Sequence, residues 1–272
     1  MTISDEQARA EARLLDEAEQ TATQIRQTTS AHPGMTMDDA YQVQAAWRDL
    51  RVDRGEVLVG HKIGLTSRAM QRAMRIDTPD SGFLTDTMVF APDSEIRTGA
   101  FTDPKVEVEL AFVLAHDLTV DPGGADLTID DVLDATDHVT PAAELLAARS
   151  LRIDPGTGQA RTVIDTVADN AADAGIVYGG QPTGPRDLDL RWVGGALSRN
   201  GIVEETGLAA GVGGHPALGI VWLARRYADQ GLALEAGQII LAGSFTRPVD
   251  VRPGDTFAFD YGPLGRFTLG FT

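Results

Sequence analysis

Residues 104–114 constrain the fold of this chain most strongly, because the character of their side chains alternates with a period of two. Val106, Val108 and Leu110 alternate with Glu107 and Glu109. This period predicts a β-strand that turns its apolar side chains to a core and both acids to the opposite face. Like charges one strand repeat apart repel each other, so the two acids either face water or bind a cation.

The composition limits the partners that the chain can have. Its 272 residues, 43% of them hydrophobic, suffice for one large globular core, and the net charge of -17 argues against nucleic acid or an anionic membrane as a partner. The chain has no cysteine, which excludes thiolate metal sites and cysteine nucleophiles. The polar, acidic start and the lack of a long apolar run predict a soluble, cytoplasmic protein.

Two helices are predicted at the N-terminal end. Ser4 and Gln7 have the spacing of a capping box, and the run that follows, to about residue 28, is rich in helix formers. Thr36 precedes a second helix, in which apolar residues such as Trp47 recur at steps of three and four residues. We therefore expect residues 1–56 to form a helical N-terminal lobe.

The remainder, residues 57–272, predicts a catalytic core built mainly of β-strands, and the chain as a whole is assigned to the α+β class. Asn200 and Gly201 lie between two apolar segments and predict a tight hairpin, because both residues tolerate a positive φ. Short helices are expected after Thr128 and Pro216. These features predict a mixed, largely antiparallel core, with strands within residues 57–64, 104–114, 191–197, 238–241, 256–261 and 266–271.

A third acid and a lysine add to the acidic strand. Glu144 lies among apolar residues, where a lone carboxylate is costly. Together with Glu107 and Glu109 it supplies three oxygen ligands, which suit Mg²⁺ or Mn²⁺ better than zinc. Lys62 either extends to the surface or serves a bound anion as charge partner or as an acid–base group of lowered pKa. His61 points to the opposite face of the same strand and is expected to be structural.

Four ordered segments, residues 60–67, 106–114, 169–175 and 241–248, resemble the hydratase and decarboxylase branch of the fumarylacetoacetate-hydrolase-like superfamily. The resemblance runs along nearly the whole chain. It implies a mixed β-roll core like the C-terminal domain of fumarylacetoacetate hydrolase. It also implies a divalent ion, Mg²⁺ or Mn²⁺, held by Glu107, Glu109 and Glu144, and assembly into homo-oligomers such as a decamer of five dimers.

The resemblance further implies a metal-dependent hydro-lyase of aromatic catabolism that adds water to a 2-hydroxydienoate or 2-oxo-enoate dicarboxylate. The alternatives within the family are decarboxylation of 4-oxalocrotonate and hydration of 2-hydroxypentadienoate, and the alternative outside it is a non-catalytic oligomeric scaffold or small-acid binding subunit. The expected catalytic residues are Lys62, Asp86 and Glu144. The expected substrate contacts are Leu84, Ser244 and Arg247.

Two of these residue assignments have a plain structural alternative. Asp86 matches an acid of the family near the substrate, but an Asp between turn residues also caps a turn. Arg247 has a guanidinium suited to the distal carboxylate of a diacid, yet an Arg beside a Pro turn is also a common surface residue. Asp165 and Asp169 fit a turn or a helix N-cap at least as well as a catalytic role.

Overall fold

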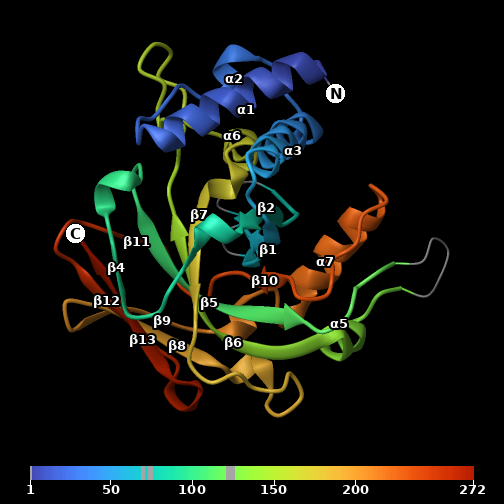
Figure 1. The fold of residues 1–272 in the computed structure, drawn as a ribbon, viewed down its shortest axis with the longest axis vertical. Helices are drawn as coiled ribbons and strands as arrows, with labels where there is room; N and C mark the ends of the chain where they lie inside the picture. The colour runs from blue at the N-terminus through green and yellow to red at the C-terminus, as the bar shows by residue number, and fades with distance from the viewer. Residues whose placement is uncertain (1, 69–70, 73–75, 121–125) are drawn as a thin grey trace.

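The computed structural model describes residues 2–68, 71–72, 76–120 and 126–272, and it stacks a helical layer on two curved sheets (Figure 1). The described helices are α1 (Asp5–Gln20), α2 (Thr28–Ala31), α3 (Met37–Asp53), α5 (Ile129–Ala135), α6 (Val163–Ala168) and α7 (Ala217–Ala228). The first strands are β1 (Leu58–Gly64), β2 (Asp80–Thr85), β3 (Val89–Phe90), β4 (Ser94–Ile96), β5 (Lys105–Leu114), β6 (Thr136–Leu146) and β7 (Asp173–Tyr178). The later strands are β8 (Gly194–Arg199), β9 (Ile202–Leu208), β10 (Ile239–Leu241), β11 (Val249–Asp250), β12 (Thr256–Asp260) and β13 (Arg266–Phe271).

The strands pair in a mixed, largely antiparallel way, which confirms the predicted fold class. One sheet has the order β2–β1–β10–β5–β6–β7–β3, with β11 pairing against β5, and the other has the order β4–β13–β12–β8–β9. The parallel pairs among the described strands are β1 with β10, β3 with β7, and β4 with β13. In the part of the chain that the structure describes, no helix is long and apolar enough to cross a membrane.

The alternation predicted for residues 104–114 is confirmed in β5. Val108 and Phe112 lie in the apolar core between the two sheets, where they join Phe257 and Phe259 of β12. Ala111, on the other face of β5, belongs to a second apolar cluster beneath the N-terminal helices. The face of β5 that carries its two glutamates is therefore directed away from the second sheet.

The N-terminal helices cover one face of the larger sheet (Figure 1). The predicted capping box is present, since the Ser4 side chain accepts from the Gln7 N–H. Trp47 of α3 is fully buried and packs edge to face against Phe83 of β2, with their ring centroids 6.0 Å apart. Burial of such aromatic side chains supplies much of the apolar area that holds the helices on the sheet.

The first helix is shorter than predicted. It ends at Gln20 rather than near residue 28, and Ala22 follows with a φ of 47°. Beyond this left-handed residue the chain is extended, and the Ile25 N–H donates to the Arg149 carbonyl at 2.9 Å. Helix propensity was overridden here by a long-range backbone pairing that the sequence around residue 25 does not show.

The predicted hairpin is confirmed, but the strand before it begins later than expected. Asn200 and Gly201 join β8 to β9 with φ values of 52° and 82°. Residues 190–192 form a turn of 3₁₀ helix, because the Asp189 side chain accepts from the Arg191 N–H at 3.1 Å. The strand therefore starts at Gly194 and leaves Trp192 exposed.

Candidate active site

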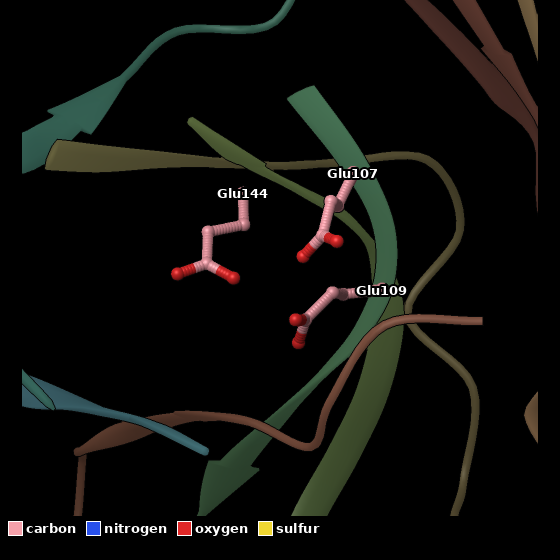
Figure 2. Close-up of side chains that lie close together, drawn as sticks. All are labelled: Glu107, Glu109 and Glu144. Atoms are coloured by element: carbon pink, nitrogen blue, oxygen red, sulfur yellow. The ribbon is translucent and has the colours of Figure 1, made fainter. Parts of the chain in front are cut away.

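Three glutamates converge where β5 and β6 pair. The antiparallel register sets Glu107 directly opposite Glu144, and Glu109 follows two residues later on the same face of β5. Figure 2 shows the three side chains pointing toward one another, and one carboxylate oxygen from each lies within 4.8 Å of the other two. Glu109 and Glu144 are buried, whereas Glu107 is partly accessible. The structure thus brings together the three residues predicted as metal ligands.

The negative charges of these three carboxylates repel one another, and the fold holds them close together despite this repulsion. Burial, and then the charge of Glu144, raises the pKa of Glu107 to about 8. The same two causes raise the pKa of Glu109 well above its ordinary value, although the Gly243 N–H donates to Glu109 Oε2 at 2.9 Å. The neighbouring cations do not fully neutralise these three acids. Their clustered oxygen donors therefore suit a divalent ion such as Mg²⁺ or Mn²⁺.

The raised pKa of Glu107 predicts how the metal-free protein responds to pH. Its folded-state pKa of about 8 lies above the ordinary value of 4.5, so the folded chain binds this proton more tightly than the unfolded chain does. This contribution to stability is complete below the ordinary pKa and is lost as the pH rises through the folded-state value. We expect the urea midpoint of the metal-free protein to fall as the pH rises from roughly pH 4.5 to pH 8, and Glu107→Gln to reduce that fall. A midpoint that rises over this interval would contradict the account.

Lys62 on β1 is the positive group of the site. Its Nζ lies 3.0 Å from Glu144 Oε1, and both side chains are buried. Burial lowers the pKa of Lys62, but the charges of Glu144, Asp80 and Asp173 outweigh it and hold that pKa above its ordinary value. Lys62 is therefore a cation at neutral pH. Of the two roles predicted beside an anion, the ion pair with Glu144 favours the charge partner.

Asp80 and Asp173 were missed by the sequence analysis, and both lie within the electrostatic reach of Lys62. Asp80 begins β2 opposite Gly64, and burial raises its pKa to about 6 against the lowering effect of Lys62. Asp173 begins β7, and burial followed by Glu144 raises its pKa well above the ordinary value. Asp173 lies in segment 169–175, one of the four segments that resemble the family, and this resemblance could have identified it. Asp80 had no such signal, because its position depends on strand pairing.

A left-handed turn fixes the positions of these two acids. Asn170, Ala171 and Ala172 have φ values of 50°, 51° and 61°, a conformation that costs energy in residues with a side chain. The Asn170 side-chain Oδ1 accepts from the Phe83 N–H at 2.8 Å, and its Nδ2 donates to the Phe83 carbonyl at 3.0 Å. These two buried hydrogen bonds tie the start of β7 to β2, so the strands that carry Asp173 and Asp80 are held together.

The structure corrects the assignments of Asp86 and Leu84. Asp86 is exposed at the end of β2, where its Oδ1 accepts from the Val57 N–H at 2.9 Å. It therefore caps a turn and does not line the cavity that holds the glutamates. Leu84 is fully buried in the apolar cluster beneath the N-terminal helices and is not among the described residues that line this cavity. The acid that the fold brings to Lys62 from this region is Asp80.

Ser244 and Arg247 do line the cavity, which has a volume of about 540 Å³ and also holds Lys62 and the three glutamates. Ser244 Oγ donates to the Val108 carbonyl at 3.2 Å and to the Thr246 carbonyl at 3.0 Å. Arg247 is 80% exposed, and its Nε and Nη2 both donate to Glu205 Oε1. The hydroxyl of Ser244 and the guanidinium of Arg247 are thus engaged by the protein itself.

The remaining polar candidates have structural partners. Asp165 completes the capping box of α6 with Thr162, and Asp169 Oδ1 lies 2.7 Å from Arg149 Nε. Burial lowers the pKa of His61 to about 3, and its Nδ1 lies 2.9 Å from the Tyr227 hydroxyl. None of these three side chains is among those that line the cavity in the described part of the chain.

Comparison with known proteins places this fold and site in a family. No family model matches the chain. The chain is 52% identical to a 2-oxo-hept-4-ene-1,7-dioate hydratase of Escherichia coli over 260 residues, which cover 96% of each chain. The chain belongs to the hydratase and decarboxylase family of the fumarylacetoacetate-hydrolase-like superfamily. Another relative in this family, a 2-keto-4-pentenoate hydratase of Paraburkholderia xenovorans (strain LB400), is 38% identical over 99% of this chain and 96% of its own length.

A solved structure of the family has the same fold over the whole length of this chain. The 4-oxalocrotonate decarboxylase from Pseudomonas putida G7, complexed with magnesium and adipate, aligns with a TM-score of 0.93. The alignment covers 100% of this chain and 99% of that one, at 34% identity. The resemblance predicted from the four sequence segments is confirmed, and with it the assignment to a family of hydro-lyases and related decarboxylases.

Proposed function

We propose that this chain is a divalent-metal-dependent hydratase that converts 2-oxohept-4-ene-1,7-dioate into 4-hydroxy-2-oxoheptanedioate. The observation that carries the proposal is the cluster of Glu107, Glu109 and Glu144 with Lys62, in a cavity of about 540 Å³. It stands in a chain that is 52% identical to a hydratase of this dioate. The step belongs to the breakdown of aromatic compounds after ring cleavage, on the homoprotocatechuate route.

Mg²⁺ is the metal that we propose, with Mn²⁺ as an alternative. Glu107, Glu109 and Glu144 would hold it through carboxylate oxygens, which both ions favour. A related decarboxylase of known structure was obtained with magnesium. When bound, the ion would supply a Lewis acid beside the 2-oxo acid end of the substrate.

The residues around the cluster account for the proton movements. The 2-hydroxydienoate form loses its hydroxyl proton and gains a proton at C5, which moves the double bond into conjugation with the C2 carbonyl. Water then adds its hydroxyl group at C4 and a proton at C3, so that one water molecule is gained. The cationic Lys62 stabilises negative charge on the C2 oxygen. Asp80, with a pKa of about 6, exchanges protons near neutral pH.

The second candidate function is decarboxylation of 4-oxalocrotonate. It is favoured by the structural match to a 4-oxalocrotonate decarboxylase, whose substrate is also a 2-oxo diacid. Both substrates have the same 2-oxo acid end, which would chelate the metal. In one reaction the enolate leads to addition of water, and in the other it forms when carbon dioxide is lost. One fold can carry both, so the product decides between them.

Product analysis tests the proposal. The protein is incubated with 2-hydroxyhepta-2,4-diene-1,7-dioate and with 4-oxalocrotonate, in Mg²⁺ and in EDTA, while ultraviolet absorbance follows the loss of conjugation. We expect the dioate to gain the mass of one water molecule in Mg²⁺ and to remain unchanged in EDTA. Release of carbon dioxide from 4-oxalocrotonate, without hydration of the dioate, would move the chain to the decarboxylases.

The homo-oligomer, including a decamer, stays a prediction. Support comes from apolar side chains that are exposed in the single chain, at Ile202 and Val203 on the edge strand β9 and at Trp192 nearby in sequence. Large apolar side chains that gather on a surface often mark an interface with another protein chain. We infer that a second copy of this chain covers them.

A further inference from the structure

The substrate that we propose carries a second carboxylate, and the cavity must offer it a positive group. Among the described residues, four cationic side chains line the cavity. Three of them already have an acidic partner, which leaves little net charge for a ligand. These pairs are Lys62 with Glu144, Lys105 with Asp250, and Arg247 with Glu205.

Arg161 is the fourth cation, and its surroundings differ. It is half-buried, and its Nη1 donates to the Ser150 carbonyl at 3.0 Å. Within the described residues, no carboxylate oxygen forms an ion pair with its guanidinium. Its charge lowers the pKa of Asp169 somewhat, against the larger effect of burial, but Asp169 is paired with Arg149. Arg161 thus keeps its charge and its remaining N–H groups available to a ligand.

The position of Arg161 along the cavity suits the far end of an extended diacid. Leu146 is the next residue after Glu144 on the same face of β6, and it lines the cavity together with Ala148 and Arg161. Two strand residues advance by about 6.6 Å, which is close to the extended length from C2 to C7 of a seven-carbon diacid. The carbon chain would therefore run past Leu146 toward the end of β6. Arg161 lies near that end, since it contacts the carbonyl of Ser150, four residues beyond Leu146.

We propose that Arg161 binds the distal carboxylate of the substrate and sets the preference of this enzyme for diacids over monoacids. The inference rests on the proposed function and reassigns the role that the sequence suggested for Arg247. A guanidinium held by one backbone carbonyl is partly oriented in advance, and its free N–H groups match the two oxygens of a carboxylate. Arg247, in contrast, would have to leave Glu205 first.

Ligand binding without turnover tests this role. The probes are 2-oxoheptanedioate and 2-oxoheptanoate, which lack the double bonds and differ only in the distal carboxylate. Calorimetry with Mg²⁺-loaded protein is expected to show that Arg161→Gln lowers the affinity for the diacid by about 10- to 100-fold. The affinity for the monoacid should fall by less than about 3-fold. Arg161→Lys should retain part of the diacid preference, since it keeps the charge without the fork.

Arg247→Gln is the matched control, because it removes the same group from another part of the same cavity wall. Its diacid preference is expected to stay within about 3-fold of the parent protein. Equal weakening of both probes by Arg161→Gln, or a selective loss of the diacid in Arg247→Gln, would overturn the inference while leaving the hydratase proposal intact. If the parent protein binds neither probe in Mg²⁺, the proposed function fails as well.

Discussion

Glu109→Gln is expected to abolish Mg²⁺ binding and to lower kcat/KM by at least about 1,000-fold, because the ligand set loses one of its three charges. The substitution keeps an oxygen for the Gly243 N–H, so the local backbone is retained. It also removes a carboxyl group whose charged form is disfavoured by burial and by the neighbouring glutamates, as its raised pKa indicates. We therefore expect the metal-free variant to be more stable to urea than the metal-free parent, while Mg²⁺ no longer stabilises it.

Glu205→Gln is the control for this experiment. Glu205 lines the same cavity but pairs with Arg247 at its exposed end, so its loss is expected to change kcat/KM by less than about 3-fold. Calorimetric titration with Mg²⁺ and urea unfolding with and without the ion provide both readouts. A Glu109→Gln protein that binds Mg²⁺ with the parent affinity would show that the cluster does not hold the metal.

Lys62→Met is the second change with a large expected effect. It should lower kcat by about 100- to 1,000-fold, because the site loses the charge that stabilises the developing oxyanion. Mg²⁺ affinity should be unchanged or higher, since a cation near the glutamates is removed. The metal-free protein should lose about 3–5 kcal/mol of stability, because Glu144 is left buried without its partner.

Lys105→Met serves as the comparison, since Lys105 lines the same cavity and also pairs with an acid, but at a more exposed position. We expect a change of less than about 1 kcal/mol in stability and little effect on kcat. Full turnover in a Lys62→Met protein that has bound its metal would remove Lys62 from the mechanism. Unfolding by urea, in EDTA and in Mg²⁺, separates the two contributions of the residue.

The parts of the site that local patterns encode were predictable from the sequence. The period of two in residues 104–114 placed Glu107 and Glu109 on one face, and the structure confirms this alternation in β5. The position of Glu144 opposite Glu107 follows from the register of β5 with β6, which no local pattern specifies. The apolar surroundings of Glu144 made it a candidate for the third ligand, and the resemblance to a family assigned it that role.

Residues whose role depends on long-range pairing were missed or wrongly assigned. Asp80 reaches the site because β2 pairs with β1 and sets it opposite Gly64. Asp86, six residues later, lies between turn residues and matched an acid of the family, but its carboxylate accepts a hydrogen bond from the Val57 N–H. Arg247 could be placed near the cavity from sequence, whereas its neutralisation by Glu205 depends on the path of the hairpin that carries β9.

The most direct test of the metal site is anomalous diffraction from crystals soaked in Mn²⁺ together with 2-oxoheptanedioate. The account predicts one strong peak among Glu107, Glu109 and Glu144, with the 2-oxo acid end of the ligand on the ion and Lys62 beside it. A soaked crystal with no peak at these three carboxylates, or with the ion bound elsewhere and the ligand absent from the cavity, would contradict it.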